Sequence, residues 1–181
     1  MNNTLQTASV VATFTALILA TNYALIGIPN VKLMDLLVFI AGFRFGCLVG
    51  ASVGALSWCI YGTLNPYGFS LPILISTSLG ETIYGLVGGL LRMPVHNPIN
   101  KAEWLTFSIK FGVFGFLLTF LYDLETNLVF AYTFGVPVPV ALAMGVPFAV
   151  THEVSNALLF ALAGPPIVFA LKKLKGGDKN A

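Results

Sequence analysis

The sequence has 181 residues, of which 57% are hydrophobic and only 9% are charged. Soluble globular domains carry about 25% charged residues, and one protein core of this size cannot bury so much apolar surface. The composition therefore excludes an ordinary soluble domain. It predicts an all-α integral membrane protein without an appended catalytic or nucleotide-binding domain, because several spans of about 20 residues each would use up most of the chain.

Apolar segments follow one another along the chain, separated by turn residues such as Pro29 and Asn30. We predict one domain, residues 1–181, built as a bundle of six transmembrane helices at residues 8–26, 33–42, 47–62, 71–91, 108–134 and 140–172. The last two segments exceed one bilayer thickness, so each is expected to tilt or to include a short interfacial helix. Pro147 and Pro165 favour an interfacial helix for the sixth segment.

The basic residues predict the orientation of these spans. With the N-terminus in the cytoplasm, only Lys32 falls on the outer side. The inner side then receives Arg44, Arg92, Lys101, Lys172, Lys173, Lys175 and Lys179, with Lys110 near that edge. Basic residues accumulate in cytoplasmic loops of membrane proteins. The sequence therefore predicts a multi-pass protein of the cell (plasma) membrane with both termini in the cytoplasm.

Ionisable residues inside the predicted spans are costly and need a partner or a purpose. Glu81 lies in the fourth span, Asp123 and Glu125 in the fifth, and His152 and Glu153 in the sixth. Asp35 begins the second span. All of them fall between the middle and the outer side of the membrane, so we expect them to line one cavity that opens outward. No Lys or Arg is expected at the same depth, and Glu125 is expected nearer the outer surface.

Further polar and aromatic residues share helix faces with these groups. Tyr84 follows Glu81 by three positions, Asn127 follows Asp123 by four, and Asn156 follows His152 by four. An amide such as Asn127 can also serve only to bridge two helices. We predict a substrate site formed by Glu81, Tyr84, Asp123, Asn127, His152, Glu153, Asn156, Trp58, Asn65 and Tyr67.

The pair His152-Glu153 does not form a metalloprotease motif. That motif needs a second histidine four positions after the first to hold zinc, and position 156 is Asn. No cluster has the spacing of metal ligands, and no glycine-rich phosphate loop precedes a lysine. We therefore expect no enzymatic activity, no cofactor, no metal and no nucleic-acid partner.

The first span carries an alanine at every fourth position. Ala8, Ala12, Ala16 and Ala20 form a slanted ridge on which another helix can approach closely. The ridge fits equally a surface for a partner helix and packing within the bundle. Gly46, Gly50 and Gly54 repeat the spacing in the third span, where internal packing is the better interpretation.

Several of these segments together resemble the substrate-binding S components of energy-coupling factor (ECF) transporters. They are residues 28–33 (IPNVKL) followed by Asp35, residues 121–127 (LYDLETN), residues 146–148 (VPF) and residues 152–157 (HEVSNA). The likeness covers nearly the whole chain, and the order of the motifs carries it more than any one of them.

The resemblance implies a subunit that captures a vitamin or related micronutrient. It also implies a transmembrane T component and two ATP-hydrolysing subunits as partners, with the alanine ridge packing against the T component. The loops after the first and third spans would cover the ligand. Family sites use polar side chains of spans four to six, which fits Glu81, Asp123, His152 and Asn156 by position, without matching any one vitamin.

Two other functions stay open at this point. One is a self-sufficient secondary transporter in which an acid carries the coupling proton. The other is an intramembrane enzyme that uses His152 and Glu153 as acid and base. For the favoured transporter, unpaired acids would repel a dianionic ligand. We therefore expect a neutral or cationic, donor-rich ligand, with Trp58, Tyr67 or Tyr84 available to stack on it.

Overall fold

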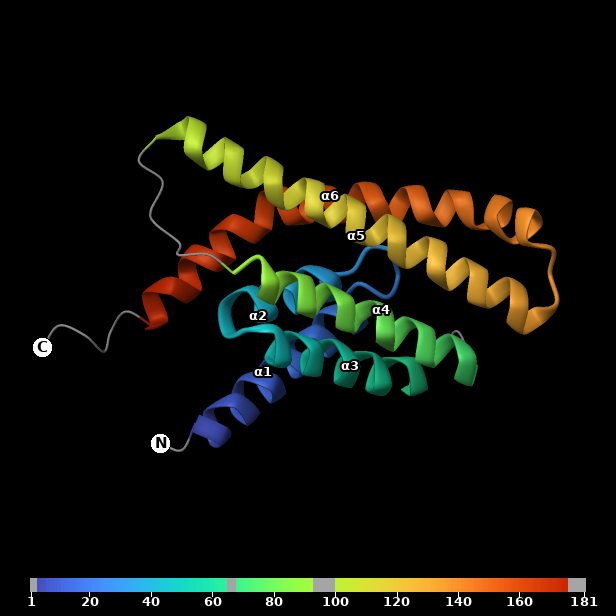
Figure 1. Cartoon of the computed structure of the whole chain (residues 1–181), viewed down its shortest axis with the longest axis horizontal. Helices are drawn as coiled ribbons and strands as arrows, with labels where there is room; N and C mark the ends of the chain where they lie inside the picture. The colour runs from blue at the N-terminus through green and yellow to red at the C-terminus, as the bar shows by residue number, and fades with distance from the viewer. Residues whose placement is uncertain (1–2, 65–67, 93–99, 176–181) are drawn as a thin grey trace, which may run out of the picture.

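The computed structural model describes residues 3–64, 68–92 and 100–175, and all elements within these ranges are helices (Figure 1). They are α1 (Asn3–Ala24), α2 (Met34–Phe45), α3 (Cys47–Leu64), α4 (Leu71–Leu90), α5 (Lys101–Phe134) and α6 (Val138–Lys175). The predicted all-α bundle of six helices is confirmed. Five of the described helices are long and apolar enough to cross a membrane.

The helix α2 is the exception in length, and it forms the centre of the bundle. Its 12 residues rise about 18 Å, less than the roughly 30 Å of a bilayer core. Its side chains from Met34 to Phe43 are all buried. A helix that is apolar on every side is stable only when protein or lipid surrounds it completely. Here neighbouring helices surround α2, and it contacts α1, α3, α4 and α6.

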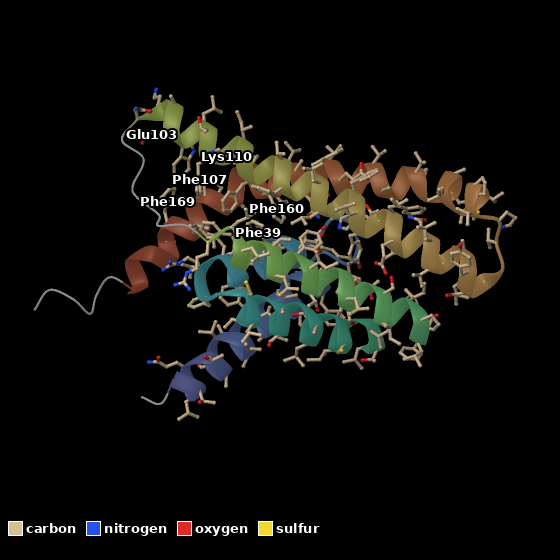
Figure 2. The ribbon with its side chains drawn as sticks, in the orientation of Figure 1. Phe39, Glu103, Phe107, Lys110, Phe160 and Phe169 are labelled. Atoms are coloured by element: carbon tan, nitrogen blue, oxygen red, sulfur yellow. The ribbon has the colours of Figure 1, made fainter. Side chains whose placement is uncertain are left out.

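Aromatic side chains of α2 pack against the two long helices α5 and α6. The ring of Phe39 lies 5.3 Å from that of Phe160 on α6 and 5.5 Å from that of Phe111 on α5, measured between ring centres. Figure 2 shows Phe39 and Phe160 pointing toward each other. Phe107 and Phe169 extend the same packing between α5 and α6 at 5.6 Å.

The helices α5 and α6 have 34 and 38 residues and lie side by side for much of their length (Figure 1). The favoured expectation of a separate interfacial helix in the sixth segment is wrong, because α6 continues through Pro147, Pro165 and Pro166. A proline removes one backbone hydrogen bond and bends a helix without having to end it. Figure 1 shows such a bend between the orange and red parts of α6.

Glycines allow the backbones of α2, α3 and α4 to touch. A Cβ atom added to Gly85 of α4 would collide with the backbone of Gly50 on α3, and one added to Gly54 would lie 2.6 Å from the carbonyl oxygen of Glu81. Internal packing is therefore confirmed for Gly50 and Gly54. Gly46 has another role, because it joins α2 to α3 with a φ of +103°, which glycine tolerates best.

Replacing Gly85 by alanine should destabilise the protein by about 1–3 kcal/mol, because the added methyl group meets backbone atoms that cannot rotate away. The free energy of unfolding in detergent measures this effect. Gly27→Ala is the matched control, since a Cβ atom there meets nothing within 4 Å. Equal stability of the two variants would contradict the close approach of α3 and α4.

Candidate functional site

A histidine lies between two carboxylates at the centre of the bundle. The Nδ1 atom of His152 on α6 lies 3.0 Å from Oδ1 of Asp123 on α5, and its Nε2 atom lies 2.8 Å from Oδ2 of Asp35 on α2. Carboxylate oxygens only accept hydrogen bonds, so both ring nitrogens donate when both carboxylates are ionised. His152 then carries a positive charge between two negative charges and joins three helices.

Hydrogen bonds extend this group to α4. The amide nitrogen of Asn156 donates to Asp35 and also to the hydroxyl oxygen of Thr119, the second at 2.8 Å. The hydroxyl of Tyr84 donates to the same Thr119 oxygen at 2.8 Å. All of these side chains are buried. We call the set the polar network, which consists of Asp35, Tyr84, Thr119, Asp123, His152 and Asn156.

Glu81 of α4 connects the polar network to an aromatic side chain. Its side chain is only 1% exposed, and its carboxyl group lies close to the side chains of Asp35 and Trp58. Two neighbouring carboxylates repel each other strongly when both are ionised, so Glu81 and Asp35 are costly to ionise together. The polar network therefore reaches Trp58 on α3.

A cavity of about 600 Å³ adjoins Trp58. Small-molecule sites typically measure about 300–1,000 Å³. The cavity lies where α1 and α3 end and α4 begins, which is the end of these helices remote from the N-terminus. It is lined by Asn22, Leu25, Ile26, Ile28, Pro29, Asn30, Val31, Lys32, Trp58, Tyr61, Gly68, Phe69, Ser70, Ile73, Phe134 and Phe148.

The segment between α1 and α2, residues 25–33, forms one wall of this cavity and is tied to α6. The side-chain amide of Asn30 donates to the backbone carbonyl of Phe148 at 3.1 Å, and the hydroxyl of Ser155 donates to the backbone carbonyl of Asn30 at 3.3 Å. Asn30 has a φ of 55°, a left-handed conformation that asparagine adopts more readily than most residues. These contacts hold the segment across the cavity.

Lys32 of this segment faces the aromatic wall. Its ammonium nitrogen lies 4.8 Å from the ring centre of Trp58 and 5.4 Å from that of Tyr61. Burial lowers the pKa of Lys32, and the nearby Asp35, Glu81 and Asp123 oppose this shift. The expectation that the acids meet no basic side chain is therefore wrong. The cause is that the segment folds inward, which residue order alone does not reveal.

The structure brings together half of the ten predicted substrate-site residues. The polar network and its immediate neighbourhood contain Glu81, Tyr84, Asp123, His152 and Asn156. Trp58 lines the adjoining cavity. Asn65 and Tyr67 lie outside the described residues.

The remaining two predicted residues lie on another side of α5 and α6. Asn127 and Glu153 line a shallow hollow of about 180 Å³ that Asp123 also borders. The side chain of Asn127 donates to the backbone carbonyl of Asp123 in its own helix at 2.7 Å. Glu125, which is expected nearer the outer surface, accepts a hydrogen bond of 2.6 Å from Ser76 of α4. Different faces of α5 therefore contribute to the polar network, to the shallow hollow and to the contact with α4.

Sequence reasoning missed several contributors. Asp35 is expected to line the cavity but is not among the ten predicted substrate-site residues, and Thr119 is not predicted at all. Asn22, Lys32 and Tyr61 line the cavity without having been predicted. One signal was present in the sequence, since Asn22 is the one amide side chain within the predicted first span. The others depend on how distant segments pack.

The alanines of the ridge on α1 have a clear location. Ala8, Ala12, Ala16 and Ala20 are all exposed, whereas Phe14, Thr15 and Ile18 form the buried side of the helix. Packing of the ridge inside the bundle is therefore excluded for the described residues. Figure 1 shows α1 projecting away from the other helices toward its N-terminus.

Both ring nitrogens of His152 are engaged by carboxylates. Among the described residues, no group of three or more His, Cys, Asp or Glu side chains is placed to hold a metal ion. Comparisons with protein families, with curated proteins and with solved structures give no match to this chain.

Proposed function

We propose that this chain is the substrate-capture (S) subunit of an ECF-type uptake transporter. It binds a small water-soluble micronutrient from outside and delivers it with a transmembrane T component and two ATP-binding subunits. The observation that carries the proposal is the cavity of about 600 Å³ whose wall, residues 25–33, is one of the loops expected to cover the ligand. Trp58, which lines the cavity, lies close to Glu81.

The charges around the cavity restrict the expected charge of the ligand. The negative charges of Asp35, Glu81 and Asp123 are largely offset by the nearby positive charges of His152 and Lys32. This near balance leaves little net charge to attract a strongly charged ligand. Of the neutral and cationic ligands expected from the sequence, we favour the neutral ones, because Lys32 faces the cavity.

The exposed alanine ridge supplies the surface for the T component in this proposal. Small side chains allow two helix backbones to approach closely within a membrane. In the described structure no other helix packs closely against this ridge, because α1 contacts the bundle with a different side. Packing against a helix of the T component would explain why the exposed side of α1 carries small residues.

Reporter proteins fused to the chain test the orientation. A reporter placed after Lys175 should be cytoplasmic, and one inserted within residues 63–70 should lie outside, because the basic residues cluster on the side of the termini. In Figure 1 the first turn of α1 and the last described turn of α6 lie toward the same end of the molecule, which supports this orientation. Alkaline phosphatase and green fluorescent protein activities report the two sides. Finding both sites on one side would contradict the six-helix arrangement in the membrane.

A second candidate is a proton-coupled carrier that needs no partner. The alternation of Asp35, His152 and Asp123 favours it, because buried chains of ionisable groups serve as proton relays in transporters. Uptake into proteoliposomes separates the two functions. The S subunit should bind its ligand but accumulate none of it alone, with or without a proton gradient. Accumulation driven by the gradient in the absence of partners would favour the carrier.

A further inference from the structure

Asn22 places an unpaired carboxamide in the wall of the cavity. It lies in the last turn of α1, its side chain is 2% exposed, and among the described residues neither Oδ1 nor Nδ2 has a hydrogen-bond partner. A buried amide without partners destabilises a fold, whereas a leucine of similar size would fill the position without that cost. Packing alone therefore does not require an asparagine here.

The neighbouring walls favour a flat ligand. Trp58 and Tyr61 present aromatic rings 5.4 Å apart, and Phe69, Phe134 and Phe148 also line the cavity. Planar rings pack well against such walls, either stacked or edge to face. The ammonium group of Lys32 lies over the rings of Trp58 and Tyr61 and offers hydrogen-bond donors, but no acceptor. A ligand placed there meets a donor at Lys32 and a donor next to an acceptor at Asn22.

A carboxamide pairs best with a group that presents one donor and one acceptor side by side. A cyclic amide (lactam) does this, because the ring holds its N–H and C=O on the same side. We propose that the cavity binds a neutral, planar nitrogen heterocycle through a lactam-type edge that pairs with Asn22, while Lys32 receives a further acceptor of the ligand. This inference rests on the proposed substrate-capture function and names the chemical class of the substrate.

The inference can be tested with pairs of probes that differ only in their N–H hydrogen-bond donors. Xanthine, uracil and lumazine carry lactam edges, and their fully N-methylated forms keep the ring shape but lose every N–H. The full chain is used in detergent with Trp104→Phe, which leaves Trp58 as the one tryptophan to report binding by fluorescence quenching. At least one lactam probe should bind tenfold or more tightly than its methylated form. No preference in any pair, or no binding of any lactam probe, would overturn the inference.

Variants of Asn22 test whether its carboxamide causes the tighter binding of lactam probes than of their methylated forms. Asn22→Leu should remove the preference for the lactam and leave the melting temperature unchanged or higher, because it removes a buried unpaired amide. Asn22→Asp should weaken lactam binding at least tenfold, because it replaces the donor by an acceptor. Thr21→Val is the control and should change neither, since the Thr21 hydroxyl donates to carbonyls of its own helix. A preference that survives Asn22→Leu, or a large fall in its melting temperature, would contradict the assignment.

A screen of cell metabolites against the intact chain separates failure of this inference from failure of the proposed function. If a small molecule binds one to one but lacks a lactam-type edge, the inference fails and the substrate-capture function stands. If no small molecule binds, the proposed function fails together with it.

Discussion

Replacing His152 by leucine should destabilise the protein by about 3–5 kcal/mol. The imidazole lies between Asp35 and Asp123, and its removal leaves two buried carboxylates without their shared partner. The network joins α2, α5 and α6, so its loss weakens the contacts of the central helix on both sides. The free energy of unfolding, measured by SDS titration in mixed micelles, reports the effect.

Two further variants serve as a control for this prediction and as a test of whether the lost stability can be recovered. Glu153→Gln changes the neighbouring residue, which is half-buried and lies outside the polar network, and should alter stability by less than about 0.5 kcal/mol. Asp35→Asn combined with Asp123→Asn in the His152→Leu chain should recover part of the loss, because the uncompensated charges disappear. A His152→Leu variant as stable as the unmodified chain would contradict the network.

Replacing Ala12 or Ala16 by tryptophan should abolish assembly with the T component. Both alanines are exposed on α1, and a large side chain at either position prevents the close approach of a second helix. Ligand binding by the solitary chain should change less than twofold, because neither residue lines the cavity. Co-purification of the coexpressed subunits measures assembly, and binding is measured on the isolated chain.

Leu17→Trp is the matched control for the alanine ridge. Leu17 is 47% exposed on the same helix but lies off the ridge, so a larger side chain there should leave assembly intact. Assembly that survives Ala12→Trp and Ala16→Trp would place the partner elsewhere. Loss of ligand binding in the two variants with assembly preserved would assign the ridge to the stability of α1.

The helical fold could be predicted from the sequence because each span is an almost continuous apolar segment. The boundaries of α5 were less accessible: it begins at Lys101, not at position 108. Polar residues such as Asn100 and Glu103 suggested a loop, yet the Asn100 side chain accepts from the backbone N–H of Glu103 and caps the helix. The continuous α6 depends on neighbouring helices that support its prolines, which local sequence does not encode.

The candidate site could be predicted only in part for a related reason. Ionisable residues within apolar spans identified Glu81, Asp123 and His152, because such groups need partners in a membrane. Their partners were harder to predict. Asp35 meets His152 across 117 positions of the chain, and Lys32 reaches Trp58 only because residues 25–33 fold inward. Helix periodicity gives the face of one helix, but not which faces meet.

Mass spectrometry of the detergent-purified chain after incubation with a metabolite extract tests the central claim most directly. A substrate-capture subunit should retain one small water-soluble molecule per chain, unaltered in mass, without ATP or any partner subunit. A Trp58→Ala variant should lose it, because Trp58 forms an aromatic part of the cavity wall together with Tyr61. Absence of a bound small molecule, or release of a chemically changed product, would contradict the account.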